Sequence, residues 1–152
     1  MLGELGTNHL KAIVLSNFFY DLKGQFRNST LQIIIDCPIE LKIEAKIQML
    51  KRCLTNLLVN SQRYADHVWI GTQVSGRFLE ITIDDNGPGI PESQREEVFR
   101  PFYRLDVSRN LETGGVGLGL SIARDVIRNH GGQIRLGDSP HGGLRVLIRL
   151  PQ

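Results

Sequence analysis

The sequence predicts a single domain of the mixed α/β class, in which strands and amphipathic helices follow one another along 152 residues. Residues Glu44–Tyr64 carry apolar side chains at helical spacing, whereas Phe78–Ile83 alternate apolar and polar side chains like a half-buried strand. Apolar residues make up 41% of the chain and charged residues 22%, a balance that favours a packed core over disorder.

The first part of the chain is expected to form a helix, a strand and a short extended segment. Apolar residues at helical spacing predict a helix over Asn8–Gln25, which Gly24 and the polar residues after it would end. Leu31–Ile35 is predicted to be a buried strand that closes at Pro38. Ile39–Ile43 is expected to add an extended piece, with its type left open.

The helix predicted over Glu44–Tyr64 carries two contrasting sides. At about 100° per residue, Asn56 and Asn60 lie roughly 40° apart, and Arg63 and Tyr64 fall beside them. Asparagine is a mediocre helix former, so this polar face has two interpretations of equal weight: a solvated surface, or a wall that binds Mg²⁺ and phosphate. The opposite side, expected to pack on a sheet, comprises Ile47, Leu50, Leu54, Leu57, Leu58 and Ser61.

Two adjacent antiparallel strands are predicted next. His67–Val74 forms the first, Ser75–Arg77 forms the hairpin turn, and Phe78–Ile83 begins the second, which carries Asp85 at its end.

The stretch that follows this hairpin is the most informative of the sequence. Gly87 and Gly89 flank Pro88, so the backbone turns there and leaves room for a flat ligand to approach. Asp85 has no basic neighbour in sequence, and such a carboxylate suits an exocyclic amine like that of adenine. Taken by itself, the stretch also fits an ordinary surface turn.

A short helix is predicted over Pro91–Phe99, because proline suits the first turn and the early acidic residues suit the helix dipole. Arg100–Gly115 has no periodicity, and a loop of this length in a compact domain is usually functional or mobile.

The last third of the sequence combines a glycine cluster, a helix and a hairpin. Gly114–Leu120 leads into a helix over Ser121–His130, so free backbone N–H groups at its entrance could hold phosphate. The spacing matches neither the P-loop nor the dinucleotide fingerprint. Gly131–Gly132 is expected to cap the helix, and Gln133–Leu136 and Leu144–Leu150 to form a final hairpin.

Composition excludes several classes of protein. The net charge of +2 is too small for a typical nucleic-acid-binding domain. The only cysteines, Cys37 and Cys53, do not make a disulfide framework, so a reduced compartment is expected. No apolar run is long enough to span a membrane, and no signal peptide is apparent at the start.

Four motifs in order resemble the catalytic and ATP-binding domain of bacterial sensor histidine kinases. Asn56–Tyr64 resembles the family's N box, Asp85–Ile90 its first glycine box, Phe99–Phe102 its F box and Gly115–Leu120 its second glycine box. The resemblance extends from about Leu31 to Leu150 and is nearest to the osmosensor-like class, within the superfamily of gyrase, the Hsp90 chaperones and MutL.

The resemblance implies a Bergerat-type fold, a two-layer α/β sandwich with helices on one face of a mixed, mostly antiparallel sheet. It implies that Asn60 binds Mg²⁺, that Asp85 binds the adenine amino group, and that Arg104 reaches the γ-phosphate of ATP. Asn60 and Arg104 would therefore take part in catalysis, whereas Phe99 and Phe102 would only anchor the lid. The implied ATP-binding set is Asn56, Asn60, Arg63, Tyr64, Asp85, Gly87, Gly89, Ile90, Arg104, Gly115, Val116, Gly117, Leu118, Gly119 and Leu120.

The resemblance also favours a kinase over an ATPase. Hydrolases of the superfamily generally carry a carboxylate at the position of Asn56, and an amide cannot act as a general base. None of the histidines His9, His67, His130 and His141 lies in the family's acceptor motif. The expected reaction is therefore transfer of the γ-phosphate to a histidine on a separate dimerisation hairpin, for relay to a response regulator, without self-phosphorylation.

Residues 1–152 are expected to be one such domain, with residues 1–6 an addition to the natural sequence. The expected location is the cytoplasm, with a parent protein in the inner membrane and no contact of this domain with membrane or nucleic acid. The alternatives are a chaperone- or topoisomerase-like ATPase fragment and a nucleotide-binding module without catalysis.

Overall fold

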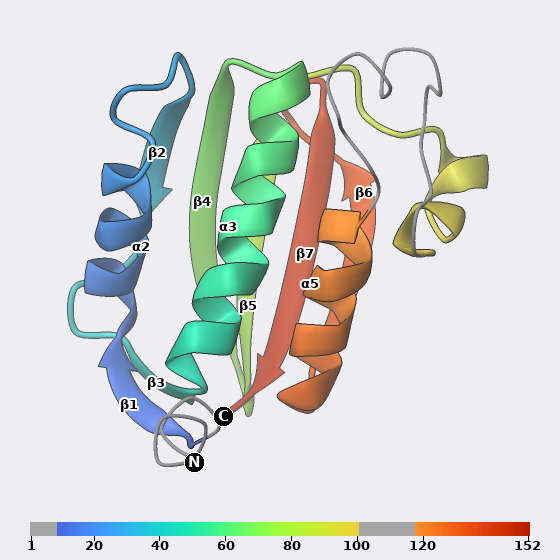
Figure 1. Ribbon diagram of the computed structural model, residues 1–152. Helices are drawn as coiled ribbons and strands as arrows, with labels where there is room; N and C mark the ends of the chain where they lie inside the picture. Colours follow the sequence, from blue (N-terminus) through green and yellow to red (C-terminus); the bar gives the residue numbers. More distant parts are fainter. Residues whose placement is uncertain (1–8, 101–117) are drawn as a thin grey trace.

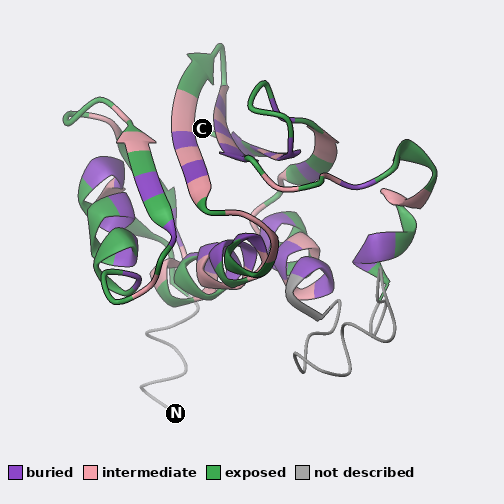
Figure 2. Cartoon of the chain, turned by 90° about the horizontal axis from the view of Figure 1, so that it is seen from above, coloured by how far each residue is buried: buried purple, intermediate pink, exposed green. Residues whose placement is uncertain are grey.

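The computed structural model describes residues 9–100 and 118–152, which form a two-layer α/β sandwich. One layer is a five-stranded sheet, and the other consists of helices that cover a single face of it (Figures 1 and 2). The helices are α2 (Leu15–Gly24), α3 (Ile47–Tyr64) and α5 (Leu118–Asn129). The strands, in spatial order, are β2 (Gln32–Asp36), β4 (His67–Ser75), β5 (Phe78–Asp85), β7 (Leu144–Pro151) and β6 (Gln133–Asp138).

The sheet is mostly antiparallel, as predicted. β4 pairs with β5 through a tight turn at Gly76, where φ is +60°, and β5 pairs with β7. Only β2 runs parallel to its neighbour, β4, at one edge of the sheet. The register sets Val68 opposite Asp85 and Trp69 opposite Asp84, so the two carboxylates point to opposite faces of the sheet. Asp85 therefore lies on the face that the helices cover.

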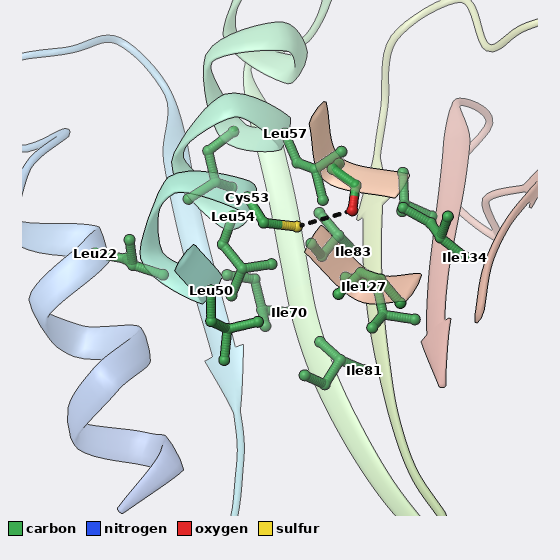
Figure 3. Close-up of a cluster of buried hydrophobic side chains, with 14 of the residues drawn as sticks. Leu22, Leu50, Cys53, Leu54, Leu57, Ile70, Ile81, Ile83, Ile127 and Ile134 are labelled. Carbon is green, nitrogen blue, oxygen red and sulfur yellow. Dashed lines mark hydrogen bonds between the residues drawn. The ribbon is translucent and has the colours of Figure 1, made fainter. Parts of the chain in front are cut away.

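The core lies between the helices and the sheet. The predicted apolar side of α3 is buried there, where it meets α5 and the inward side chains of β4 and β5 (Figure 3). The α3–α5 contact includes Cys53, whose Sγ lies 3.8 Å from the carbonyl oxygen of Ala123. The end of α5 is fixed by the predicted glycine cap: Gly132 N–H donates to the Ile127 carbonyl at 2.9 Å, and φ of Gly131 is +76°.

The helix expected over Asn8–Gln25 is only partly correct. Lys11–Val14 form strand β1, which pairs antiparallel with β3 (Lys42–Ala45) in a separate two-stranded sheet. α2 begins at Leu15 and ends at Gly24. The apolar spacing of residues 10–22 fits a helix locally, but the pairing with β3 joins residues about thirty positions apart, which local periodicity does not report. For the same reason α3 begins at Ile47, because Glu44 is part of β3.

Two other expectations need correction. The strand after α2 begins at Gln32 and is not buried throughout, because it is an edge strand on which Ile33 is buried and Ile34 is exposed. The helix expected over Pro91–Phe99 is a pair of 3-10 turns, η1 (Glu92–Gln94) and η2 (Glu97–Phe99). Val98 and Phe99 are both buried, and burying two consecutive side chains suits a tight turn better than a surface helix.

Among helices in the described ranges 9–100 and 118–152, none is long and apolar enough to cross a bilayer.

Cysteine reactivity offers a direct check of this core. Burial raises the pKa of the Cys53 thiol to about 12 and, more weakly, that of Cys37, so Cys53 remains protonated and inert at neutral pH. We expect an alkylating reagent to label Cys37 slowly in the native protein, and to label both cysteines once the chain is unfolded. Native Cys37→Ser should take no label, and rapid labelling of that variant would contradict the packing of α3 against α5.

Candidate functional site

The site is built around Asp85, the last residue of β5, a residue that is only 6% exposed. Its Oδ1 accepts hydrogen bonds from the backbone N–H groups of Gly87 at 3.0 Å and Leu144 at 2.9 Å. Its Oδ2 faces the Ser61 hydroxyl of α3 at 3.4 Å, a long contact. One oxygen is thus held by the backbone, and the other retains capacity to accept a hydrogen bond from a ligand.

The neighbouring carboxylate, Asp84, has a different environment on the open face of the sheet. Arg145 donates to both of its oxygens, from Nε at 2.7 Å and from Nη2 at 2.9 Å. These hydrogen bonds raise the pKa of the Arg145 guanidinium further above its usual range. Within the part of the chain that the structure describes, Asp85 has no such cationic partner. Asp84 is thereby committed to structure, and Asp85 is the carboxylate available for recognition.

Glycines bring three backbone segments close together around Asp85. A Cβ on Gly143 would lie 2.2 Å from Asp85 Oδ1, and a Cβ on Gly87 would lie 2.8 Å from the carbonyl oxygen of Tyr64. Gly89 has φ of +75°, a conformation that favours glycine. The end of α3, the loop after β5 and the start of β7 therefore meet at distances that a side chain would prevent.

Asn86 fixes the loop that leaves β5. Its Oδ1 accepts from the N–H groups of Asp66 and His67, both at 3.1 Å, and its Nδ2 donates to Asp66 Oδ1 at 2.7 Å. Hydrogen bonds from His67 and then Asn86 hold the pKa of Asp66 below its usual range. This clamp connects the first glycine box to the start of β4, directly after α3.

The polar face predicted on α3 is present and leads to the same site. Asn56, Asn60 and Tyr64 are half-buried, and Arg63 is exposed. Neither asparagine side chain hydrogen-bonds to any residue in the described ranges, so both amide oxygens are available to a ligand. In those same ranges no group of three or more histidine, cysteine, aspartate or glutamate residues gathers as a metal site. Amide oxygens such as those of Asn56 and Asn60 are ligands of a kind that Mg²⁺ accepts.

Only the end of the second glycine box, residues 118–120, lies within the described residues. Arg104, Gly115, Val116 and Gly117, together with Phe102, lie outside the described residues. Leu118 and Gly119 open α5, and the Leu120 side chain in its first turn is buried in the core. The Ile90 side chain is likewise buried in the core. Any contact of Leu120 or Ile90 with a nucleotide would thus involve mainly the backbone.

The F box is anchored to α5 by Arg124. Phe99 is buried, and the Arg124 guanidinium lies over its ring, 4.5 Å from the centroid. Arg124 also pairs with Glu96 at 2.6 Å. A second arginine, Arg95, donates to the Ile90 carbonyl at 3.0 Å and so fixes the loop on its other side. The lid that Phe99 is expected to anchor lies outside the described residues, so this role stays a prediction.

Sequence reasoning missed three contributors to the site: the Ser61 hydroxyl, Gly143 and the Leu144 N–H. Ser61 had a recognisable signal, because it is a polar residue on the otherwise apolar side of α3. Leu144 contributes only a backbone group, 59 residues away from Asp85 in sequence, and no residue type signals such a contact.

A family model described as histidine kinase-, DNA gyrase B-, and HSP90-like ATPase matches residues 45–152 of the chain. The sensor histidine kinase CpxA of Escherichia coli K12 is 45% identical over 145 residues, which cover 95% of this chain and 31% of CpxA. The chain thus spans about a third of the length of that relative.

Solved structures agree with the fold. The ATP binding domain of PrrB from Mycobacterium tuberculosis superimposes with a TM-score of 0.76 at 26% identity, over 94% of this chain and 97% of that domain structure. The mycobacterial sensor histidine kinase MprB superimposes with a TM-score of 0.79 at 24% identity, over 93% of this chain and 97% of that structure. These likenesses confirm the two-layer sandwich that the sequence predicts.

Proposed function

We propose that this chain, which belongs to the family of histidine kinase-, DNA gyrase B- and HSP90-like ATPases, binds Mg-ATP and transfers the γ-phosphate to a histidine on a separate helical hairpin. Its counterpart in that family is the ATP-binding catalytic domain of sensor histidine kinases. The observation that carries the proposal is the state of Asp85: buried, without an ion-pair partner among the described residues, and with one oxygen left for a ligand.

Asp85 selects adenine in this proposal. The backbone N–H groups of Gly87 and Leu144 fix Oδ1, which leaves Oδ2 to accept from the exocyclic amine of the base. Guanine carries a carbonyl oxygen at the equivalent position, so a carboxylate there would face an acceptor and disfavour GTP. Ser61 and Tyr64 line the α3 side of the same space.

The polar face of α3 binds the metal and the phosphates. Asn60 supplies an amide oxygen to Mg²⁺, Asn56 and Arg63 lie on the phosphate side, and Tyr64 lies toward the base or ribose. Arg104 and the amides of Gly115, Val116, Gly117, Leu118 and Gly119 are proposed to hold the phosphate tail. Mg²⁺ supplies charge neutralisation of the phosphate oxygens when it is bound.

Transfer is favoured over hydrolysis because Asn56 stands where a hydrolase would need a base. An amide does not take a proton from water, so a stronger nucleophile must attack the γ-phosphorus. In the proposed step the acceptor imidazole nitrogen forms a bond to phosphorus, the bond from phosphorus to the bridging oxygen breaks, and ADP leaves. Arg104 would steady the charge that develops in this step.

The acceptor histidine is proposed to lie on another domain, because His67 and His130, which are half-buried, and His141, which is exposed, each contact other residues of this domain. His130 accepts from Lys46 N–H at Nε2, at 2.9 Å, and its Nδ1 lies 2.9 Å from the Val126 carbonyl. Nδ1 of His67 lies 2.7 Å from Asp66, and the ring of His141 stacks on Trp69. The proposed partner is the dimerisation hairpin of the parent kinase. The response regulator would then receive the phosphate from this hairpin. The proposed location is the cytoplasm, where ATP is available.

Mixing the chain with the histidine-bearing hairpin of its parent kinase and γ-labelled ATP tests this function. We expect label on the hairpin only when both proteins are present, and no stable label on the chain alone. Histidine-linked label on the isolated chain would contradict transfer in trans. ATP binding without transfer would indicate a nucleotide-binding module, and rapid phosphate release without hairpin label would indicate an ATPase.

The metal assignment makes a separate prediction. Asn60→Ala should remove the gain in ATP affinity that Mg²⁺ provides, because the amide oxygen that would complete the cation's coordination is lost. The fold should be retained, since the side chain is half-buried and makes no hydrogen bond to described residues. Calorimetric titration with ATP, with and without Mg²⁺, measures this, with Arg52→Ala on the same helix as the control. An unchanged dependence on Mg²⁺ would refute the assignment.

A further inference from the structure

The turn between β6 and β7, residues 139–143, determines where Asp85 points. The residue after the turn, Leu144, donates its N–H to Asp85 Oδ1 at 2.9 Å. The last residue of the turn, Gly143, leaves no space, since an added Cβ would lie 2.2 Å from Asp85 Oδ1 and 2.6 Å from the backbone nitrogen of Gly87. A displacement of this turn by even a fraction of an ångström would therefore reorient the carboxylate.

The turn is closed on itself by hydrogen bonds. Ser139 N–H donates to the Gly143 carbonyl at 2.9 Å, and the Ser139 hydroxyl accepts from His141 N–H at 3.0 Å. Gly142 has φ of +96° and completes the reversal. Ser139 therefore connects the backbone of His141 to that of Gly143.

The side chain of His141 stacks on Trp69, outside the nucleotide site. The ring centroids are 3.5 Å apart and the planes differ by 10°. Trp69 also stacks with His67, with centroids 5.8 Å apart at 23°. Trp69 lies on the open face of β4 opposite Asp84 in register, and its neighbour Val68 lies opposite Asp85. The stack therefore fastens the turn to the strand beside Asp85.

The backbone beyond Asp85 is tied to the same stack. The N–H of His67 donates to Asn86 Oδ1 at 3.1 Å, and Nδ1 of the same residue lies 2.7 Å from Asp66. Asn86, directly after Asp85, is thus bonded to the backbone of His67, and Leu144, which donates to Asp85, directly follows the turn that carries His141. The rings of both histidines stack with Trp69.

We propose that His141 and Trp69 are positioning residues that set the adenine selectivity of the site, by holding the 139–143 turn and hence Asp85 Oδ1 in place from the open face of the sheet. The inference rests on the proposed function of Asp85. This positioning role can be distinguished from a purely structural role of the stack. Loss of a purely structural stack would lower the stability of the fold and leave the ratio of ATP to GTP affinity unchanged.

The test compares His141→Ala with His141→Phe, with Gln73→Ala, an exposed residue of β4, as the control. Calorimetric titrations with Mg-ATP and Mg-GTP give both affinities, and a thermal melt of each variant gives its stability. Emission of Trp69, the only tryptophan of the chain, reports whether a ring still lies on the indole.

We expect His141→Ala to weaken ATP binding about threefold to tenfold, the loss typical of one stacked aromatic pair, with a smaller change for GTP. His141→Phe should restore the ratio of ATP to GTP affinity, and the Gln73→Ala control should match the original protein. If His141→Ala keeps that ratio, even with a lower melting temperature, the positioning role is refuted and the proposed function stands. If the unaltered chain fails to bind ATP, the proposed function itself fails.

Discussion

Asp85→Asn should lower the affinity for ATP by roughly 10- to 100-fold, which corresponds to about 1–3 kcal/mol for an unpaired group in a buried site. The asparagine oxygen would take the place of Oδ1, because the N–H groups of Gly87 and Leu144 require an acceptor. The NH₂ group would then take the place of Oδ2 and meet the amine of adenine donor to donor. The same group would suit the carbonyl of guanine, so the preference for ATP over GTP should shrink or reverse.

Calorimetric titration of both nucleotides measures this, with Asp125→Asn on the exposed side of α5 as the control. The control should bind as the original protein does. A folded Asp85→Asn protein that binds ATP with unchanged affinity and unchanged preference would show that this carboxylate does not recognise the base.

Gly143→Ala should be the most damaging single methyl addition near the site. The new Cβ would lie 2.2 Å from Asp85 Oδ1, 2.5 Å from the Asp85 carbonyl oxygen and 2.6 Å from Gly87 N. Two of these atoms are backbone and the third is a carboxylate held by two N–H groups, so the methyl group displaces the turn or the carboxylate. Overpacking of this kind costs about 1–3 kcal/mol of folding free energy, and we also expect ATP binding to be lost.

Gly137→Ala in β6 is the matched control, because a Cβ there meets no atom within 4 Å. Denaturant unfolding and ATP titration of the two variants should separate them clearly, with Gly137→Ala within about 0.5 kcal/mol of the original stability. Equal stability and equal ATP affinity for the two variants would contradict the close approach of β7 to Asp85.

The sequence predicted those elements whose signal is local. The periodicity of α3 and the alternation of β5 and β7 each specify their own element, and the glycine after α5 marks its end. Strand β1 could not be predicted in this way, because its four residues become a strand only by pairing with β3, far along the chain. The β-branched pair of Ile13 and Val14 was the one local hint of a strand there.

The residues of the candidate site also fall into those with a local sequence signal and those that depend on contacts between distant parts of the chain. Asp85 and the α3 amides stood out, because these residue types are unusual where they occur. Asp85 is held by backbone N–H groups, and the lack of a side chain at Gly143 lets the backbone of the 139–143 turn approach it. In the positioning role proposed above, the ring of His141 holds that turn against Trp69. Such contributions depend on which residues lie close together in space. From the sequence, the pair Gly142–Gly143 predicted only a turn.

The most direct test of the central claim is a calorimetric titration of the chain with ATP and with GTP, each with and without Mg²⁺. We expect ATP to bind with one site per chain, Mg²⁺ to strengthen its binding, and GTP to bind at least tenfold more weakly. Equal affinities for the two nucleotides, or no binding of ATP in the presence of Mg²⁺, would contradict it.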